Sequence, residues 1–466
     1  MTLPAKFVER VLRDLGGTEG AALCAALDAE PPVSVRLNPA KTGAETVSAG
    51  PDAGLPALAI AGRVPWSRDG RYLAVRPSFT LDPDFHAGAY YVQEASSQFV
   101  GHLLAAVRTE GARILDLCAA PGGKTTLYAS LAGPDGLVVA NEIDRRRASV
   151  LADNVRKWGT GNVAVTTCEP RALGDFEAWF DVVAVDAPCS GEGMFRKDPD
   201  ARGEWSEGNV KQCAARQDEI LREAWRALRP GGTLVYSTCT FNRDEDEGAL
   251  ERMAAWAGDE IAESEETAVE DAWGIVCGRV GAFRTFRFYP HRTCGEGFFA
   301  AVARKSFDAG GRVRAPKARR TVFAAVDRKT AGELARWVRN PGGMRFAAVA
   351  DTCYAWYAAQ ADAVRTLSEA LPVIYSGVAL GQVFKGVLKP DPALAFFDGL
   401  NRGALPAAEL DDEETLRFLR RQDIAAGGLA EGMNLVCSRG RALGFAKRIG
   451  ARVNNLYPNS LRIIKQ

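Results

Sequence analysis

The sequence predicts an α/β protein built around a mostly parallel sheet that helices cover on both faces. From about residue 86 to residue 303, short apolar runs alternate with helix-like stretches, which is the pattern of consecutive βαβ units. The runs are continuously apolar, as expected of strands buried on both faces. The chain has 466 residues, 47% apolar and 25% charged, enough for two to four ordinary globular domains.

The elements of this sheet can be assigned in chain order. The expected strands are Arg113–Leu117, Leu137–Glu142, Val163–Thr167, Asp181–Asp186 and Thr233–Ser237, and the expected helices are Thr125–Ala132, Arg145–Trp158 and Asn209–Leu228. In the last helix, Leu221, Trp225 and Leu228 recur on one face, and the Arg-Pro-Gly-Gly run at 229–232 should end it. Two further strands, Thr285–Phe288 and Gly297–Ala303, are expected to close the sheet.

Four domains are expected along the chain. Residues 1–85 combine a helical start with proline-rich turns and form a small N-terminal lobe, and residues 86–306 form the α/β domain. Residues 307–372 form a linker and a middle α+β region, with helices at Lys329–Val338 and Trp356–Ala370. Residues 373–466 contain short strand-like pieces broken by glycines and form a β-rich C-terminal domain.

Composition excludes several classes of protein. No apolar run reaches the roughly 18 residues of a membrane span, and the N-terminus lacks the pattern of a secretory signal, so we expect a cytoplasmic protein without a membrane partner. Ten cysteines form no C-x-x-C pair and only three histidines occur, which disfavours a disulfide scaffold, a zinc ribbon and a histidine metal site. No metal is expected.

Charge is distributed unevenly although the formal net charge is zero. Arg243–Asp271 holds twelve acidic residues against two basic ones, whereas residues 432–466 hold seven basic residues and no acidic one. A basic stripe on a rigid domain favours local contact with a polyanion such as RNA, and we expect Arg448 and Arg452 to contact phosphates. The alternative is a solvated face.

The stretch Asp116–Lys124, DLCAAPGGK, is a candidate cofactor loop between a strand and a helix. Its glycines let the backbone approach a ligand, and the helix N-terminus presents unpaired N–H groups. Glu142 ends the next strand 19 residues after Gly123, the position of a ribose-binding carboxylate in dinucleotide folds. The loop lacks the nicotinamide and Walker patterns. S-adenosylmethionine, which has a ribose and a carboxylate, fits.

Two later motifs each place a cysteine after a strand: DAPCSG at Asp186–Gly191 and STCT at Ser237–Thr240. In open parallel sheets, ligands bind beyond the carboxyl ends of the strands. Cys189, Cys239 and Asp186 should therefore converge near the cofactor. The alternative is that both cysteines only pack at strand ends.

Two thiols beside a methyl donor suit one chemistry in particular. Carbon 5 of cytosine is a poor nucleophile, but a thiolate that adds to carbon 6 produces an enamine whose carbon 5 can attack a methyl sulfonium. Loss of the carbon-5 proton and elimination of the thiol follow. A free thiol is only a few percent ionised near pH 7, so the site must favour the thiolate. A carboxylic acid at Asp186 could donate to ring nitrogen 3.

Six motifs together resemble the Nol/Nop/Sun family of RNA cytosine-C5 methyltransferases, over residues 30–305. They are RLNP (36–39), GAYYVQEASSQ (88–98), DLCAAPGGKTT, DAPCSGEGMFRKDP, YSTCT and RFYPHRTCGEGFFAA (287–301). The resemblance implies a Rossmann-like class I methyltransferase domain that uses S-adenosylmethionine, preceded by an RNA-binding lobe. The tail LGFAKRIGARVNNLYPNSLR is similar to the end of the PUA-like RNA-binding domain of the bacterial member that modifies 16S ribosomal RNA. We therefore expect a monomer that acts on small-subunit ribosomal RNA or the 30S subunit.

The resemblance also implies roles for individual residues. Cys239 is the nucleophile, Cys189 assists product release, and Asp186 both activates the base and contacts the cofactor. Glu142 holds the ribose, and Glu169 lies beside the adenine, where the family usually carries aspartate. The methionine end of the cofactor is cradled by Cys118, Ala119, Ala120, Pro121, Gly122, Gly123 and Lys124.

Three alternatives remain open at this stage. A ribose 2′-O-methyltransferase can share the AAPGG loop, but it needs a lysine-centred site and no cysteine pair. A non-catalytic RNA-binding assembly factor could keep the fold, although Cys189, Cys239 and Asp186 argue against it. A transfer RNA could replace ribosomal RNA as the substrate of a cytosine-5 enzyme.

Overall fold

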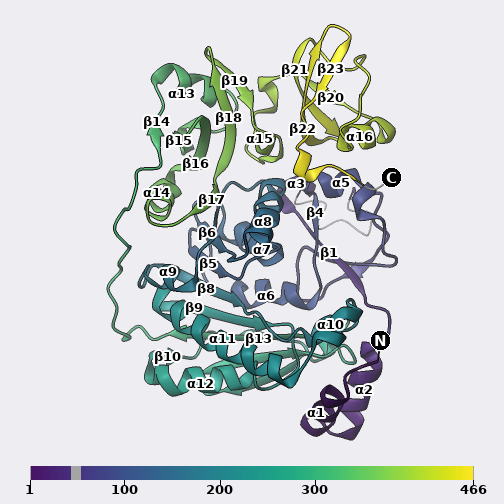
Figure 1. The fold of residues 1–466 in the computed structure, drawn as a ribbon, viewed down its shortest axis with the longest axis vertical. Helices are drawn as coiled ribbons and strands as arrows, with labels where there is room; N and C mark the ends of the chain where they lie inside the picture. The colour runs from purple at the N-terminus through teal and green to yellow at the C-terminus, as the bar shows by residue number, and fades with distance from the viewer. Residues whose placement is uncertain (1, 44–53, 465–466) are drawn as a thin grey trace.

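The computed structural model describes residues 2–43 and 54–464, and the strands of these residues form four sheets (Figure 1). The largest sheet has ten strands, in the order β11-β12-β13-β9-β8-β5-β6-β7-β17, with β10 paired to β13. Its five central strands, from β9 to β7, run parallel, and the flanking strands run antiparallel to their neighbours. The predicted α/β fold is confirmed, but the sheet is mixed and not mostly parallel, because its four parallel pairs are flanked by five antiparallel ones. The strand bounds are β5 Arg113–Leu117, β6 Leu137–Asn141, β7 Val163–Thr166, β8 Phe180–Asp186, β9 Leu228–Thr238, β10 Ile261–Ala262, β11 Val276–Val280, β12 Phe283–Phe288, β13 Phe298–Lys305 and β17 Val373–Ser376.

Helices cover both faces of this sheet because its strands are apolar on both sides. In β5, for example, Ile114 packs into the core on one face and Leu115 into the core on the other. The first core is completed by α6 Phe99–Ala105, α7 Gly123–Ala132 and α8 Arg145–Trp158. The second is completed by α9 Pro170–Gly174, α11 Glu207–Ala227, α12 Glu247–Ala257 and α14 Ala361–Ala370. None of the helices in the described part of the chain is long and apolar enough to cross a membrane.

The end of α11 agrees with the sequence prediction to within one residue. The helix stops at Ala227, and Leu228 already has an extended backbone that pairs with Phe180 of β8. The Arg-Pro-Gly-Gly run at 229–232 follows within the bounds of β9, but the pairing with β8 resumes only at Thr233, so the run is an irregularity of the strand without partners on β8. Gly231 has φ +72° there, a conformation that favours glycine.

The N-terminal lobe contains a second sheet in the order β2-β3-β1-β4. Its strand β4 lies beyond the boundary expected at residue 85, since Val92 pairs with Val35 of β1. The sheet of the lobe thus continues to residue 92, because strands distant in sequence can pair only in the folded chain. The elements are α1 Ala5–Leu15, α2 Gly17–Leu27, β1 Val33–Leu37, α3 Pro39–Thr42, β2 Ile60–Arg63, β3 Gly70–Leu73, α5 Pro83–His86 and β4 Tyr90–Val92.

The middle domain contains a five-stranded sheet in the order β14-β15-β16-β18-β19. This sheet crosses the boundary expected at 372/373, because β18 pairs with β16, and β17 joins the edge of the large sheet beside β7. We place the end of the middle domain near residue 400 instead. Trp356, expected in a helix, lies in β16. The elements are β14 Ala324–Ala325, α13 Arg328–Ala335, β15 Met344–Val349, β16 Thr352–Tyr357, β18 Val378–Phe384, β19 Val387–Pro390 and α15 Pro392–Phe396.

The C-terminal domain is a small β-rich unit at the top right of Figure 1. Its sheet has the order β20-β21-β22-β23, in which β20 runs parallel to β21 and the other pairs are antiparallel. The elements are β20 Ala407–Glu409, α16 Asp412–Leu419, β21 Gly432–Ser438, β22 Arg441–Ile449 and β23 Arg452–Asn455.

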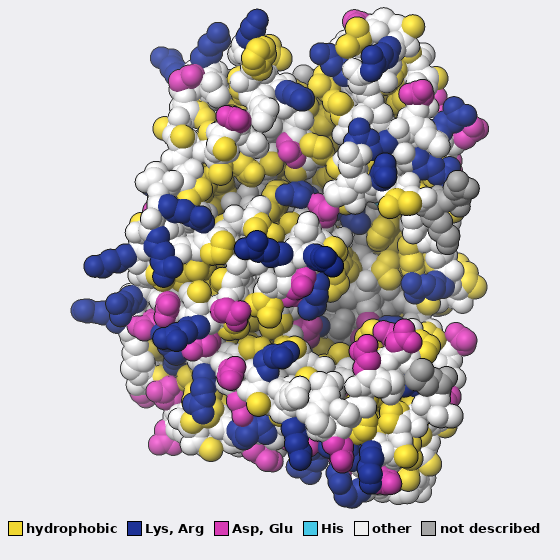
Figure 2. Space-filling model, viewed as in Figure 1, with side chains coloured by type: hydrophobic (Ala, Val, Ile, Leu, Met, Phe, Trp, Pro, Cys, Tyr) yellow, Lys and Arg dark blue, Asp and Glu magenta, His cyan; other side chains and the backbone are white. Residues whose placement is uncertain are grey.

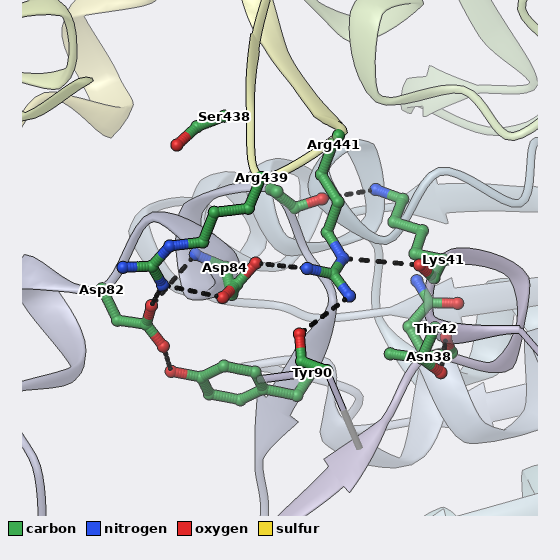
Figure 3. A network of polar contacts seen from close by, with 12 residues as sticks. Asn38, Lys41, Thr42, Asp82, Asp84, Tyr90, Ser438, Arg439 and Arg441 are labelled. Carbon is green, nitrogen blue, oxygen red and sulfur yellow. Dashed lines mark hydrogen bonds and ion pairs between the residues drawn. The ribbon is translucent and has the colours of Figure 1, made fainter. Parts of the chain in front are cut away.

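A buried carboxylate joins this domain to the N-terminal lobe (Figure 3). Asp84 is 1% exposed and forms ion pairs with Arg441 at 2.7 Å and Arg439 at 3.0 Å. Asp82 accepts a hydrogen bond from the Tyr90 hydroxyl at 2.5 Å and lies 3.4 Å from Arg439. Two of the seven basic residues of the tail therefore hold the domains together and do not face an external polyanion.

We predict that Asp84→Ala lowers the free energy of unfolding by about 3 kcal/mol, because it leaves the partly buried Arg441 without its carboxylate and removes one of the three carboxylates that pair with Arg439. Urea-induced unfolding monitored by circular dichroism measures the change. Asp412→Ala is the matched control, since Asp412 also pairs with Arg439 but its side chain is 68% exposed, and it should cost about 1 kcal/mol or less. Equal losses in the two variants would contradict the assignment.

Candidate active site

The two cysteine motifs begin side by side because β8 and β9 are parallel neighbours. Asp186, the last residue of β8, is paired in register with Ser237 of β9. The loops that follow bring the sulfur atoms of Cys189 and Cys239 to 3.3 Å from each other. Both cysteines are free and partly buried, and the separation is too long for the S–S bond of a disulfide. The two thiols thus lie together at the carboxyl ends of β8 and β9, as expected from the sequence.

A buried glutamate holds the two loops in place. Glu245 is 0% exposed, and its carboxylate accepts hydrogen bonds from the Ser190 N–H at 2.9 Å, the Asn242 amide at 2.7 Å and the Gln217 amide at 3.0 Å. Because Ser190 follows Cys189 and Asn242 lies three residues after Cys239, this one carboxylate fixes both cysteine loops.

Glu192 makes a second clamp between the same loops. It is 1% exposed and accepts hydrogen bonds from the Phe241 N–H at 2.8 Å and the Trp205 indole at 3.0 Å. The Gly193 N–H donates to the backbone carbonyl of Cys239 at 2.8 Å. The position of each thiol is therefore set by satisfied buried hydrogen bonds.

The surroundings act on the thiol of Cys189. The contact with Cys239, and after it burial, raises the pKa of Cys189 well above its usual value. Cys189 therefore keeps its proton near neutral pH, and either sulfur can be the donor in the contact between the two.

A lysine–aspartate pair lies at the same rim. Lys124 Nζ is 2.9 Å from Asp186 Oδ1, and the Ser237 hydroxyl donates to the same oxygen at 3.0 Å. Burial alone would lower the pKa of Lys124, but the attraction of Asp186 and of Cys239 raises it. Lys124 therefore stays an ammonium group at the rim where the two cysteine loops begin.

The glycine-rich loop lines a cavity of about 170 Å³ next to this pair. Most of the loop residues predicted to bind the cofactor contribute to its wall: Cys118, Ala119, Ala120, Pro121, Gly123, Lys124 and also Asp186. Gly122 does not line the cavity. It is the N-cap residue that precedes α7 and has φ +111°, a conformation that favours glycine. The opposite wall comes from the N-terminal lobe, residues 91–94 and 97.

The two predicted acidic contacts differ in their surroundings. Glu142 directly follows β6, is 2% exposed, and accepts a hydrogen bond from the Asp144 N–H at 3.0 Å. Its second oxygen is buried without a hydrogen-bond donor, with the Arg147 guanidinium 3.3 Å away. Glu169 is exposed at the start of α9. Neither residue lines the cavity of the loop.

Sequence reasoning assigned no role to Arg36, which joins the N-terminal lobe to the loop. Its guanidinium is 1% exposed and donates to the Thr126 hydroxyl at 2.6 Å, the Gly123 carbonyl at 3.1 Å and the Gln93 amide oxygen at 2.8 Å. Arg36 lies in the RLNP motif and Gln93 in the GAYYVQEASSQ motif. The motifs drew attention to these residues, but they did not show which residues the two contact. Glu192 and Glu245 were missed because acidic side chains are ordinarily exposed.

Three family descriptions match the chain and together cover most of it. Residues 103–304 match the family described as 16S rRNA methyltransferase RsmB/F. Residues 3–95 match the N-terminal domain of 16S rRNA methyltransferase RsmF, and residues 406–463 match the RsmF PUA domain. The middle domain lies between the match that ends at residue 304 and the match that begins at residue 406.

Whole-length relatives and solved structures agree with these matches. The chain is 32% identical to ribosomal RNA small subunit methyltransferase F of Shewanella loihica over 85% of this chain and 83% of the relative. It is 33% identical to the protein of that name from Escherichia coli O127:H6, over 85% and 84%. Among solved structures, a methyltransferase homologue from Pyrococcus horikoshii is 27% identical with a TM-score of 0.54, covering 64% of this chain and 94% of that one.

The site fits S-adenosylmethionine on two observations. The buried oxygen of Glu142 lacks a donor, which a ribose hydroxyl would supply. The first turn of α7 begins in the wall of the loop cavity, and its N–H groups suit a carboxylate. Cys118 has φ +63° at the loop entrance, a strained conformation of the kind found at ligand sites.

We predict that Glu142→Gln weakens the binding of S-adenosylmethionine about 10- to 100-fold, since a charge-assisted hydrogen bond of about 1.5–3 kcal/mol is lost. Isothermal titration calorimetry measures the affinity, and thermal unfolding checks that the variant is folded. Glu169→Gln should change the affinity less than about threefold, because Glu169 is exposed. Unchanged binding in a folded Glu142→Gln protein would remove Glu142 from the cofactor site.

Proposed function

The chain belongs to the RsmF-type 16S rRNA methyltransferases of the RsmB/F family, and on this premise we propose that it methylates carbon 5 of cytosine through a covalent adduct on Cys239. The activity of the family is the methylation of ribosomal RNA with S-adenosylmethionine. Cytosine as the base, carbon 5 as the position and the adduct as the mechanism are our proposals. The observation that carries them is the 3.3 Å separation of two free thiols beside the cofactor loop.

Cys239 is proposed as the nucleophile. Its sulfur must lose a proton before it adds to carbon 6 of the base. Cys189 keeps its own proton and lies 3.3 Å from the sulfur of Cys239. One thiolate beside one thiol is the arrangement that nucleophilic addition requires.

The proton-donating role predicted for Asp186 is better assigned to Lys124. Asp186 accepts a hydrogen bond from Ser237 and pairs with Lys124 through the same oxygen, which describes a carboxylate and not a carboxylic acid. Lys124 carries the proton that could stabilise charge developing on the ring as the thiolate adds. Asp186 then orients Lys124 and lines the cofactor cavity.

S-adenosylmethionine, held by the glycine-rich loop, would supply the electrophilic methyl group for carbon 5. The carbon-5 proton then passes to a solvent base, and its electron pair re-forms the ring double bond as the carbon–sulfur bond to Cys239 breaks and returns the thiolate. The thiol of Cys189 lies 3.3 Å from that sulfur. Glu245 holds the loop of Cys189 in place through the N–H group of Ser190. We assign to Cys189 assistance in this elimination step.

The RNA is proposed to contact both flanking domains while the catalytic pocket extrudes one base. The N-terminal lobe supplies a wall of the cofactor cavity, and the C-terminal domain matches an RsmF PUA domain. We propose that a monomer acts on 16S ribosomal RNA, free or in the 30S subunit.

We predict that Cys239→Ala abolishes cytosine-5 methylation, leaving less than a few percent of wild-type turnover, while S-adenosylmethionine still binds. Cys189→Ala should instead accumulate an RNA adduct that resists denaturing gels. Bisulfite sequencing of 16S ribosomal and transfer RNA from cells that carry each variant in place of the wild-type gene measures the product.

The double variant is the control for the adduct, since without Cys239 none should form. A 16S bisulfite signal that is unchanged when the gene is deleted would contradict the proposed function, and a signal lost from transfer RNA instead would reassign the substrate. A folded Cys189→Ala protein that forms no adduct during turnover would leave Cys189 as a packing residue.

The basic residues of the tail generate a separate prediction, in which Lys447 takes the place of Arg448. Arg448 donates to the carbonyl oxygens of Ala426 at 3.1 Å and Leu429 at 2.6 Å, so it holds a loop and is no longer proposed to contact phosphate. Lys447 and Arg452 are exposed and lie on one face of the β22–β23 pair.

We predict that Lys447→Glu combined with Arg452→Glu weakens RNA binding and lowers the slope of log affinity against log salt by about 2, because two phosphate contacts are lost. Fluorescence anisotropy at several salt concentrations measures the slope. The affinity for S-adenosylmethionine should not change. An unaltered slope would show that this face only keeps the domain solvated.

A further inference from the structure

A cavity of about 350 Å³ opens where the N-terminal lobe, the middle domain and the C-terminal domain meet. Its charged lining residues are Lys41, Arg339, Asp398, Arg402 and Arg441. Lys41 comes from α3 of the lobe, Arg339 and Asp398 from the middle domain, and Arg402 and Arg441 from the C-terminal side. Lys and Arg side chains are visible in this region of the face drawn in Figure 2, and Lys41 and Arg441 lie next to each other in Figure 3.

Lys41 is held in the cavity by neutral acceptors. Its ammonium group donates to the backbone carbonyl oxygens of Ala87 at 2.7 Å and Lys157 at 2.6 Å. These two hydrogen bonds fix the position of Lys41 Nζ, and neither acceptor carries a negative charge. Burial lowers the pKa of Lys41 to about 7, with Asp398 opposing this effect and the positive charges of Lys157 and Arg441 adding to it.

The two arginines at the mouth are positioned in the same way. Arg402 donates to the Gly440 carbonyl at 3.1 Å, and Arg339 donates to the backbone carbonyl of Asp398. Both side chains belong to exposed residues. Within the described part of the chain, neither has a carboxylate partner within 4 Å, whereas Arg441 is paired with Asp84.

The lining therefore carries an excess of positive charge. Arg339, Arg402 and Arg441 are permanently cationic, Lys41 is partly protonated near pH 7, and Asp398 is the one carboxylate among the lining residues. Asp84, which does not line the cavity, pairs with Arg441. Cations that are oriented by carbonyl groups but lack a counter-ion form a preorganised site for an anion. Planar guanidinium groups of this kind suit phosphate oxygens in particular.

A second cavity of about 520 Å³ lies beside the first and shares Arg339, Phe397 and Asp398 with it. Its other charged lining residue is Asp135, so the excess of positive charge is confined to the first cavity, which is called the groove below. The charges of the groove come from three domains, and a phosphate of the RNA that the proposed function names as substrate can meet them all at this junction.

We propose that this groove binds backbone phosphates of the substrate RNA, with Lys41, Arg339 and Arg402 as the contacts. The inference rests on the proposed function, because the RNA is the substrate named there. It assigns a role to the middle domain, since Arg339 and Asp398 lie outside the three matched family segments. A phosphate at the junction would touch all three domains, so RNA binding would also stabilise their arrangement.

The test is the double variant Arg339→Gln/Arg402→Gln, assayed for binding to a 16S ribosomal RNA fragment over a range of salt concentrations. We expect about a tenfold loss of affinity at fixed salt, and a slope of log affinity against log salt that is smaller by about 1–2. The affinity for S-adenosylmethionine should remain unchanged. In methylation assays the KM for RNA should rise while kcat stays within about twofold.

Arg365→Gln/Arg417→Gln is the matched control. It removes the same charge from the same two domains, at side chains that are 60% and 54% exposed and lie outside the groove, and it should keep the wild-type slope. Arg339→Lys/Arg402→Lys retains the charge and should recover most of the slope. This charge-retaining variant keeps the test decisive if the glutamine variant unfolds.

Three outcomes would overturn the proposal. The first is a folded glutamine variant with wild-type RNA affinity and slope, and the second is an equal loss in the control pair. The third is binding of inorganic phosphate, measured by calorimetry, that the glutamine variant loses while RNA affinity is unchanged, since this would assign the site to a free anion. Failure of the proposed function is distinguishable, because it would appear as absence of 5-methylcytosine in wild-type reactions.

Discussion

The parallel pairing of β8 with β9 is the constraint on which the candidate active site depends. Because Asp186 and Ser237 are opposite each other in register, the loops that follow leave the sheet at the same height and on the same edge. Two buried glutamates, Glu192 and Glu245, then join these loops through hydrogen bonds to backbone and side-chain donors. Burying two carboxylates is unfavourable unless they are hydrogen-bonded, so the satisfied network selects one arrangement of the loops, and with it the position of both thiols.

The flanking domains take part in the site and are not merely attached to it. Arg36 of the N-terminal lobe holds the first turn of α7, and the lobe supplies one wall of the cofactor cavity. Asp84 of the same lobe is paired with Arg439 and Arg441 of the C-terminal domain. The N-terminal lobe therefore contacts both the loop that receives the cofactor and the domain at the other end of the chain, through two separate sets of polar contacts.

Sequence reasoning was accurate where a property is local. The strand–loop–helix of residues 113–132 was predicted almost to the residue, because its apolar run, paired glycines and helix start are encoded in consecutive positions. It was less accurate where partners lie far apart. β4 and β17 pair with strands distant in sequence, and two of the three expected domain boundaries, 85/86 and 372/373, are crossed by sheets. The acidic run after Arg243 gave no sign that Glu245 and Asp246 are fully buried.

The sequence by itself determined the chemistry available to this protein: two cysteines after two strands, an aspartate between strand and thiol, and a glycine loop that leads into a helix. These follow from residue type and spacing, which tertiary structure cannot alter. Only the tertiary structure decided the protonation states of these groups. Cys189 keeps its proton because Cys239 contacts it and the site is buried. Lys124 stays charged although it is buried, because it is paired with Asp186 at 2.9 Å. Protonation depends on distance and burial, and these exist only once the chain has folded.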